Sequence, residues 1–178
     1  MKYAKIERER RFLLAAPPPG LAAAHREIED LYFPGTTLRL RAVRTPDGAP
    51  IEWKLGQKLR GPGGPAERVM TSVYLARGEY ELLARLPGLR LHKRRHVQVE
   101  GGVAFSVDVF LGPLAGLVLA EKEAGSDASL HAIAMPSFAC CEVTELASFT
   151  GGALASADPE VVLREARERI ARGRASTC

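Results

Sequence analysis

Strict alternation of apolar and polar residues recurs along this chain and limits the folds open to it. Within residues 37–43, apolar side chains occupy every second position and alternate with Arg39 and Arg41. The same period of two runs through residues 51–59 and 103–110. Successive side chains of a β-strand point to opposite faces, so this period predicts strands and not helices.

Further patterns of both kinds complete the expected architecture. The other strand patterns cover residues 5–14, 68–75, 89–99, 117–124 and 138–144, most of them separated by glycine- or proline-rich breaks. Helical patterns cover residues 21–31, 77–86, 128–135 and 158–172. Closure of a mostly sequential antiparallel sheet removes its exposed edges. We therefore expect an α+β fold in one domain spanning residues 1–178: an eight-stranded antiparallel β-barrel, a closed tunnel, with a few helices packed outside.

Composition excludes several other classes of protein. The chain is 46% hydrophobic and 26% charged, as is usual for a globular protein, and only 6% aromatic, which leaves little for a base-stacking surface. No apolar run approaches the roughly 20 residues of a membrane-spanning helix, and no apolar segment of the signal-peptide type is visible. The three cysteines, two of them adjacent, suit a reducing compartment. We expect a cytoplasmic protein, monomeric or homodimeric, without membrane partners or specific nucleic-acid readout.

Each predicted strand has a face that carries charged residues. This face carries Glu7, Glu9, Arg11, Arg39, Arg41, Lys54, Lys58, Arg68, Lys93, Arg95, Asp108, Glu121 and Glu123. It is either the solvent side of a half-buried sheet or the lumen of a barrel. Lys93 and Arg95 share their face with leucines and valines, and two leucines precede Glu121 and Glu123 in the same way. A solvent face would expose those apolar side chains, so the pattern favours the lumen.

The two Glu-x-Glu pairs and the basic residues make chemical sense together. Two carboxylates at this spacing lie about 7 Å apart along one strand face. Carboxylate oxygens are ligands that Mg²⁺ or Mn²⁺ prefers, while Arg and Lys bind phosphate oxygens. A divalent metal and a polyanion would neutralise both sets of charges at once.

Several of these segments also resemble one known family. Residues 6–13, Ile-Glu-Arg-Glu-Arg-Arg-Phe-Leu, resemble the N-terminal Glu-x-Glu-x-Lys signature of the CYTH superfamily, the triphosphate tunnel metalloenzymes. Matching segments follow in the order of the family at residues 30–32, 38–41, 54–58, 92–96, 105–110, 119–123 and 142–144. The chain therefore resembles the short bacterial members over roughly residues 5–155.

The resemblance implies roles for individual residues. Metal ligands for one or two Mg²⁺ or Mn²⁺ ions would be Glu7, Glu9, Asp108, Glu121 and Glu123. Phosphate would be bound by Arg39, Arg41, Lys54, Lys58, Arg68 and Arg95. Catalytic roles would fall to Lys93, to Tyr32 as the residue that positions it, and to Arg11. Family members hydrolyse inorganic tripolyphosphate, thiamine triphosphate or nucleoside and RNA 5′-triphosphates, and a few cyclise ATP.

The chain departs from the family pattern at a few positions. Arg11 occupies a position where the family usually has Lys, and Gly56 one where it has Thr. Met70 and Ser72 replace two glutamates, and Leu146 and Ser148 occur where the family often has an Asp and an Arg. We expect hydrolysis of a triphosphate, inorganic tripolyphosphate first among the candidates. Two alternatives remain at this stage, which are cyclisation of ATP in the same tunnel and non-catalytic binding of a polyphosphate or nucleotide.

Overall fold

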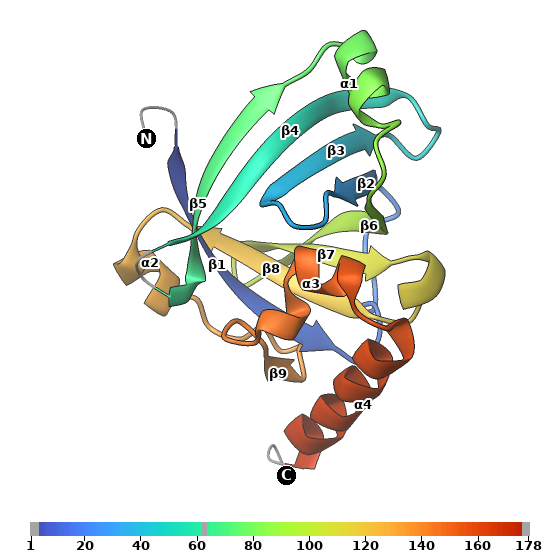
Figure 1. Cartoon of the computed structure of the whole chain (residues 1–178). Helices are drawn as coiled ribbons and strands as arrows, with labels where there is room; N and C mark the ends of the chain where they lie inside the picture. The colour runs from blue at the N-terminus through green and yellow to red at the C-terminus, as the bar shows by residue number, and fades with distance from the viewer. Residues whose placement is uncertain (1–3, 62–63, 176–178) are drawn as a thin grey trace.

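The expected closed barrel is present in the computed structural model, which describes residues 4–61 and 64–175 (Figure 1). Its strands are β1 (Lys5–Leu14), β2 (Arg26–Tyr32), β3 (Leu38–Arg44), β4 (Pro50–Gly61), β5 (Gly64–Tyr74), β6 (Leu89–Glu100), β7 (Val103–Phe110) and β8 (Val118–Ala124). They are antiparallel in the order β5-β4-β3-β2-β6-β7-β8-β1. The first half of β1 pairs with β5 and its second half with β8, and this double pairing closes the ring.

The helix predicted at residues 21–31 is wrong, because residues 26–31 of this segment belong to strand β2. The glutamate-rich segment Glu27-Ile28-Glu29 has fair helical propensity on its own. In the fold it lies between β3 and β6 and forms a ladder with both, so hydrogen bonds on two edges override the local preference.

The strand predicted at residues 138–144 is reduced to β9 (Cys141–Glu142), a two-residue addition to the free edge of β1. The barrel thus has the expected number of strands but a different membership, with β2 in place of this segment. Cys178 lies outside the described residues.

Helices cover the outside and one end of the barrel. They are α1 (Arg77–Leu83), α2 (Asp127–His131), α3 (Gly151–Ser156) and α4 (Pro159–Ala175), with 3-10 turns η1 (Gly112–Leu114) and η2 (Ala147–Phe149). Three were expected with slightly different ends, whereas α3, which begins with two glycines, was not. None of the helices described combines the length and the apolar character needed to cross a membrane.

An apolar cluster fills one end of the barrel lumen. Leu13, Leu91, Phe110 and Leu119 pack there against side chains of η2, α3 and α4, among them Phe149. Each of the four strand residues lies two positions from a charged residue, namely Arg11, Lys93, Asp108 and Glu121. A step of two along a strand keeps the same face, so the charged layer lies directly beyond the plug inside the barrel. This plug determines the depth of the cavity.

Candidate functional site

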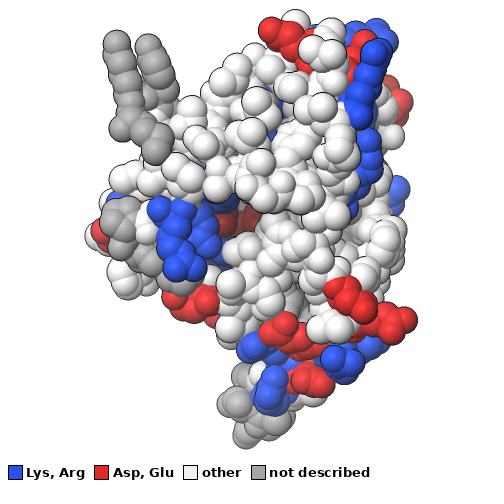
Figure 2. Space-filling model, viewed as in Figure 1, with Lys and Arg blue, Asp and Glu red and all other residues white. Residues whose placement is uncertain are grey.

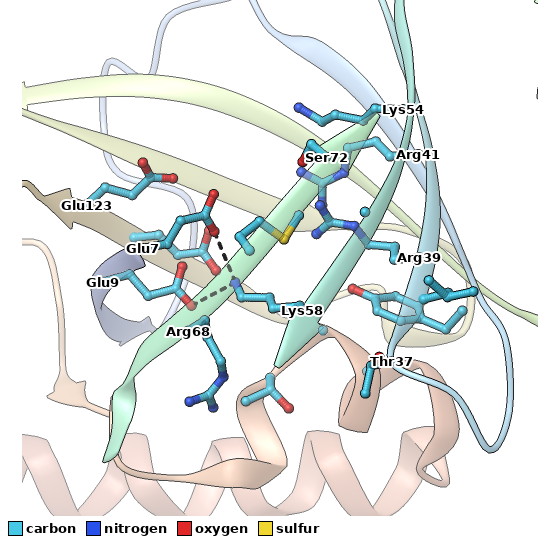
Figure 3. A pocket seen from close by; sticks show the side chains of 18 of the residues that line it. Glu7, Glu9, Thr37, Arg39, Arg41, Lys54, Lys58, Arg68, Ser72 and Glu123 are labelled. Atoms are coloured by element: carbon cyan, nitrogen blue, oxygen red, sulfur yellow. Dashed lines mark hydrogen bonds and ion pairs between the residues drawn. The ribbon is translucent and has the colours of Figure 1, made fainter. Parts of the chain in front are cut away.

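A cavity of about 400 Å³ lies within the barrel (Figure 3). Its lining includes every predicted site residue apart from Asp108: Glu7, Glu9, Arg11, Tyr32, Arg39, Arg41, Lys54, Lys58, Arg68, Lys93, Arg95, Glu121 and Glu123. In the space-filling view, acidic side chains are visible within a hollow beside a group of basic ones (Figure 2). The prediction of a charged lumen is therefore confirmed in its geometry, while the chemical roles of these residues remain predictions.

Four carboxylates from β1 and β8 share one wall of the cavity, which we call the acidic wall (Glu7, Glu9, Glu121 and Glu123). Glu9 is directly opposite Glu123 in the strand register. The Cβ atoms of such opposed residues lie about 4.5–5.5 Å apart, and like charges at that spacing repel. Lys58 offsets part of this repulsion, since its Nζ lies 3.5 Å from Glu9 Oε1 and 3.7 Å from Glu7 Oε2.

Glu121 is held as a carboxylate by neighbouring cations. Burial by itself would raise the pKa of this group, but Lys93, Arg95 and Arg11 hold the pKa well below its usual range. Arg95 Nη2 lies 2.5 Å from Glu121 Oε2. Glu121 therefore stays ionised across the pH range in which proteins are stable.

Asp108 lies behind the cavity surface and not in its lining. Its side chain is fully buried; Arg95 Nε donates to Oδ1 at 2.6 Å, Arg95 Nη2 donates to Oδ2 at 2.6 Å, and Lys93 Nζ also donates to Oδ2. Burial lowers the pKa of Lys93. Burial would also lower the pKa of Arg95, but Asp108 raises that pKa well above its usual value. The structure thus shows Asp108 as the anchor of two lumen cations, and Nη2 of Arg95 joins it to Glu121.

Asp30 anchors lumen arginines in the same way as Asp108 anchors Lys93 and Arg95. The sequence did not lead us to assign a role to Asp30. Arg41 donates to its two oxygens at 2.6 and 2.7 Å, and Arg39 Nε lies 3.6 Å away. Burial alone would raise the pKa of Asp30, but Arg41 and Arg39 hold this pKa well below its usual range. The alternation of residues through β2 could have indicated this role. We did not recognise it because residues 21–31 were interpreted as a helix.

Arg11 carries donors without partners inside the protein. Its side chain is 1% exposed, and Nη1 donates to the carbonyl of Phe149 at 2.8 Å. Within residues 4–61 and 64–175, its Nε and Nη2 atoms and Nε of Arg39 have no hydrogen-bond partner, although Arg11 Nε lies 3.4 Å from Glu9. Buried donors are nearly always satisfied, so these atoms point to an anionic ligand in the cavity.

Tyr32 lines the cavity beside helix α3. Its phenol is kept neutral, since burial and nearby Asp30 raise its pKa to about 12. The resemblance implies that Tyr32 positions Lys93, but the ammonium of Lys93 is bonded to Asp108, and no hydrogen bond joins it to Tyr32 among the residues described. In this structure Asp108 is therefore the residue that positions Lys93.

Residues that sequence reasoning left without a role also line the cavity. They are Thr36, Thr37, Leu38, Gly56, Met70, Ser72, Thr150, Gly151 and Gly152. Two of the departures from the family pattern are in contact: a Cβ placed on Gly56 would lie 2.7 Å from Cε of Met70. The methionine thus fills the space that a side chain at position 56 would need. Leu146 and Ser148 lie outside the lining.

The donor atoms of the acidic wall suit a hard divalent cation, because all of them are carboxylate oxygens. In the part of the chain that the structure describes, no three His, Cys, Asp or Glu side chains are already arranged to hold a metal ion. The reason is visible in the ion pairs: Lys58 engages Glu7 and Glu9, and Arg95 engages Glu121. The residues fit such an ion in their chemistry, and binding would require an exchange of partners.

The contact between α3 and Tyr32 leads to a first prediction. A Cβ on Gly151 would lie 2.2 Å from Tyr32 Oη, which is too close without movement of the ring or the helix. We expect Gly151→Ala to lower the free energy of unfolding by about 1–3 kcal/mol, as overpacking does. At Gly152 a Cβ would meet the ring at 3.8 Å, an ordinary contact, so Gly152→Ala is the matched control. Urea unfolding of both variants measures the difference, and equal midpoints would contradict the proposed contact.

Comparison with known proteins identifies solved structures with a similar fold. No family model matches the chain, and no curated protein matches it. Among solved structures, it is similar to the crystal structure of the hypothetical protein NE1496, with 29% identity and a TM-score of 0.57 over 86% of this chain and 99% of that chain. It is also similar to the crystal structure of the inorganic triphosphatase NE1496, with 28% identity and a TM-score of 0.57 over 86% of this chain and 96% of that chain. The chain therefore has the fold of NE1496, a closed barrel.

Proposed function

We propose that this protein hydrolyses a triphosphate inside the barrel, with inorganic tripolyphosphate as the preferred substrate and Mg²⁺ or Mn²⁺ as the metal. The observation that carries the proposal is the buried guanidinium of Arg11, which lines a cavity shared with four carboxylates and has two nitrogen atoms without a hydrogen-bond partner in the described part of the chain. The lining has eight basic side chains against four carboxylates, so its excess positive charge suits a polyanion, and the carboxylates supply the oxygen ligands that a divalent cation prefers. The name of NE1496, an inorganic triphosphatase, supports the same activity at 28% identity.

The basic residues of the cavity bind and orient the phosphate chain in this proposal. Arg41 is held rigidly by Asp30, and Arg95 by Asp108, so both present their remaining N–H groups without rearranging. Preorganised donors of this kind stabilise charge that develops in a transition state. Arg11, Arg39, Lys54, Lys58 and Arg68 extend the set along the lumen.

The acidic wall would hold the metal through Glu7, Glu9, Glu121 and Glu123. A bound Mg²⁺ or Mn²⁺ supplies charge stabilisation at the phosphate oxygens and lowers the pKa of a bound water. A water molecule attacks the terminal phosphorus in line, the bond to the bridging oxygen breaks, and diphosphate and orthophosphate leave. The proton of the water ends on phosphate or solvent. The Lys93 ammonium, held by Asp108, is the lumen donor placed to orient that water.

Phosphate release from tripolyphosphate, measured with each metal, tests the proposal. We expect Glu7→Ala and Glu121→Ala to lower kcat/KM by about 100-fold or more, as does the loss of a group that stabilises the transition state. Glu81→Ala is the control, because Glu81 pairs with Arg77 at 2.7 Å on the exposed face of α1 and lies outside the cavity lining. Turnover that persists unchanged in both lumen variants would exclude this assignment of the acidic wall.

A non-catalytic role in binding a triphosphate is the second candidate. Met70 and Ser72 line the cavity at positions where the CYTH pattern has glutamates, so the lumen holds fewer carboxylates than the pattern implies. Tight tripolyphosphate binding by calorimetry, without metal-dependent release of phosphate, would favour this role over hydrolysis.

A further inference from the structure

Lys58 occupies the position between the two carboxylates of β1. Its ammonium lies 3.5 Å from Glu9 Oε1 and 3.7 Å from Glu7 Oε2, and Figure 3 shows it reaching across the lumen from β4 to both. In the described part of the chain, the ammonium makes ion pairs with only these two carboxylates. A cation bound by Glu7 and Glu9 would need the same oxygens.

We propose that Lys58 is an internal counter-ion that takes the place of the divalent cation at Glu7 and Glu9 until a triphosphate is bound. This inference rests on the proposed function. The ammonium competes with the metal for the carboxylates while the cavity is empty. When the phosphates enter, Lys58 moves to them and leaves Glu7 and Glu9 to the metal.

Two other cations near the acidic wall, Arg95 and Arg11, are each held by a second partner. Arg95 donates through Nε and Nη2 to buried Asp108, and Arg11 donates through Nη1 to the carbonyl of Phe149. Lys58 has a flexible stem with a point charge at its end and a side chain that is 31% exposed. It is therefore the cation that can move between carboxylate and phosphate over a short distance.

The exchange has a thermodynamic consequence. Metal binding alone would displace the ammonium without offering it a new partner, and phosphate binding alone would leave Glu7 and Glu9 without a counter-charge. Each ligand thus favours the binding of the other, and the coupling is reciprocal. The lack of a ready-made metal group among the described residues agrees with carboxylates that are already engaged.

Binding of Mn²⁺ in the absence of any phosphate tests this role. Mn²⁺ affinity is measured by electron paramagnetic resonance for the wild type, Lys58→Met and Lys54→Met. We expect Lys58→Met to bind Mn²⁺ about fivefold more tightly or better, a change in the range of ordinary site-to-site coupling. Lys54→Met removes the same charge from the same cavity, but Lys54 pairs with Glu52 at 2.8 Å, so we expect a much smaller gain.

The opposite prediction applies to the substrate, since Lys58→Met loses a phosphate contact and should raise KM for tripolyphosphate. Lys58→Gln serves as a second neutral variant, and circular dichroism verifies that each variant is folded. Mn²⁺ affinity that is equal or weaker in both Lys58 variants, with normal tripolyphosphate turnover by the wild type, would overturn the counter-ion role alone. Absence of both Mn²⁺ and tripolyphosphate binding in the wild type would overturn the proposed function as well.

Discussion

Replacing Asp108 by asparagine is expected to lower the free energy of unfolding by about 3–5 kcal/mol, the usual effect of removing one partner from a buried ion pair. Asp108 is fully buried and accepts hydrogen bonds from Lys93 and from two nitrogens of Arg95. The asparagine amide carries no charge, so Lys93 would lose its ion pair with Asp108, and of its two carboxylate partners Arg95 would keep only Glu121. The midpoint of urea unfolding, compared with the wild type, measures the loss.

Glu123→Gln is the matched control for this prediction. It makes the same chemical change in a carboxylate that lines the cavity but is exposed. We expect its stability to stay within about 0.5 kcal/mol of the wild type, as for most surface substitutions. Equal unfolding midpoints for Asp108→Asn and the wild type would show that Asp108 does not anchor the lumen cations.

The second large effect is expected at Arg11, where stability and binding should respond differently. Arg11→Met removes two buried nitrogen donors that have no hydrogen-bond partner among the described residues, and it also removes one hydrogen bond to Phe149 and the ion pair with Glu9. Relief of the unsatisfied buried donors opposes the loss of the hydrogen bond to Phe149 and of the ion pair with Glu9, so we expect a smaller effect on stability than on binding. Loss of charged contacts to phosphate should weaken tripolyphosphate binding by about 3 kcal/mol, more than a hundredfold.

Isothermal titration calorimetry with tripolyphosphate and urea unfolding of the same variant separate the two effects. Arg44→Met is the control, because Arg44 pairs with Glu29 at 3.4 Å and lies outside the cavity lining. Undiminished affinity in Arg11→Met would contradict the assignment of its free donors to phosphate.

The sequence predicted the strands most reliably where charged and apolar residues alternate strictly. Arg39 and Arg41 in β3, and Lys54 and Lys58 in β4, all line the cavity, as their shared face required. The prediction was wrong for β2, where the segment Glu27-Ile28-Glu29 also has fair helical propensity. Local pattern could not decide this segment, since β2 is also paired with β6, which lies far along the chain.

The sequence by itself determined which side chains share a face, because the period of a strand is a local property of the backbone. It therefore determined a barrel with a lumen of carboxylates and bases. Only the tertiary structure decided which charges meet. Strand register places Glu9 opposite Glu123, buries Asp108 against Lys93 and Arg95, and brings Lys58 between two carboxylates of another strand. The partners lie on different strands, and ion pairing depends on the distances between them, which no local pattern contains.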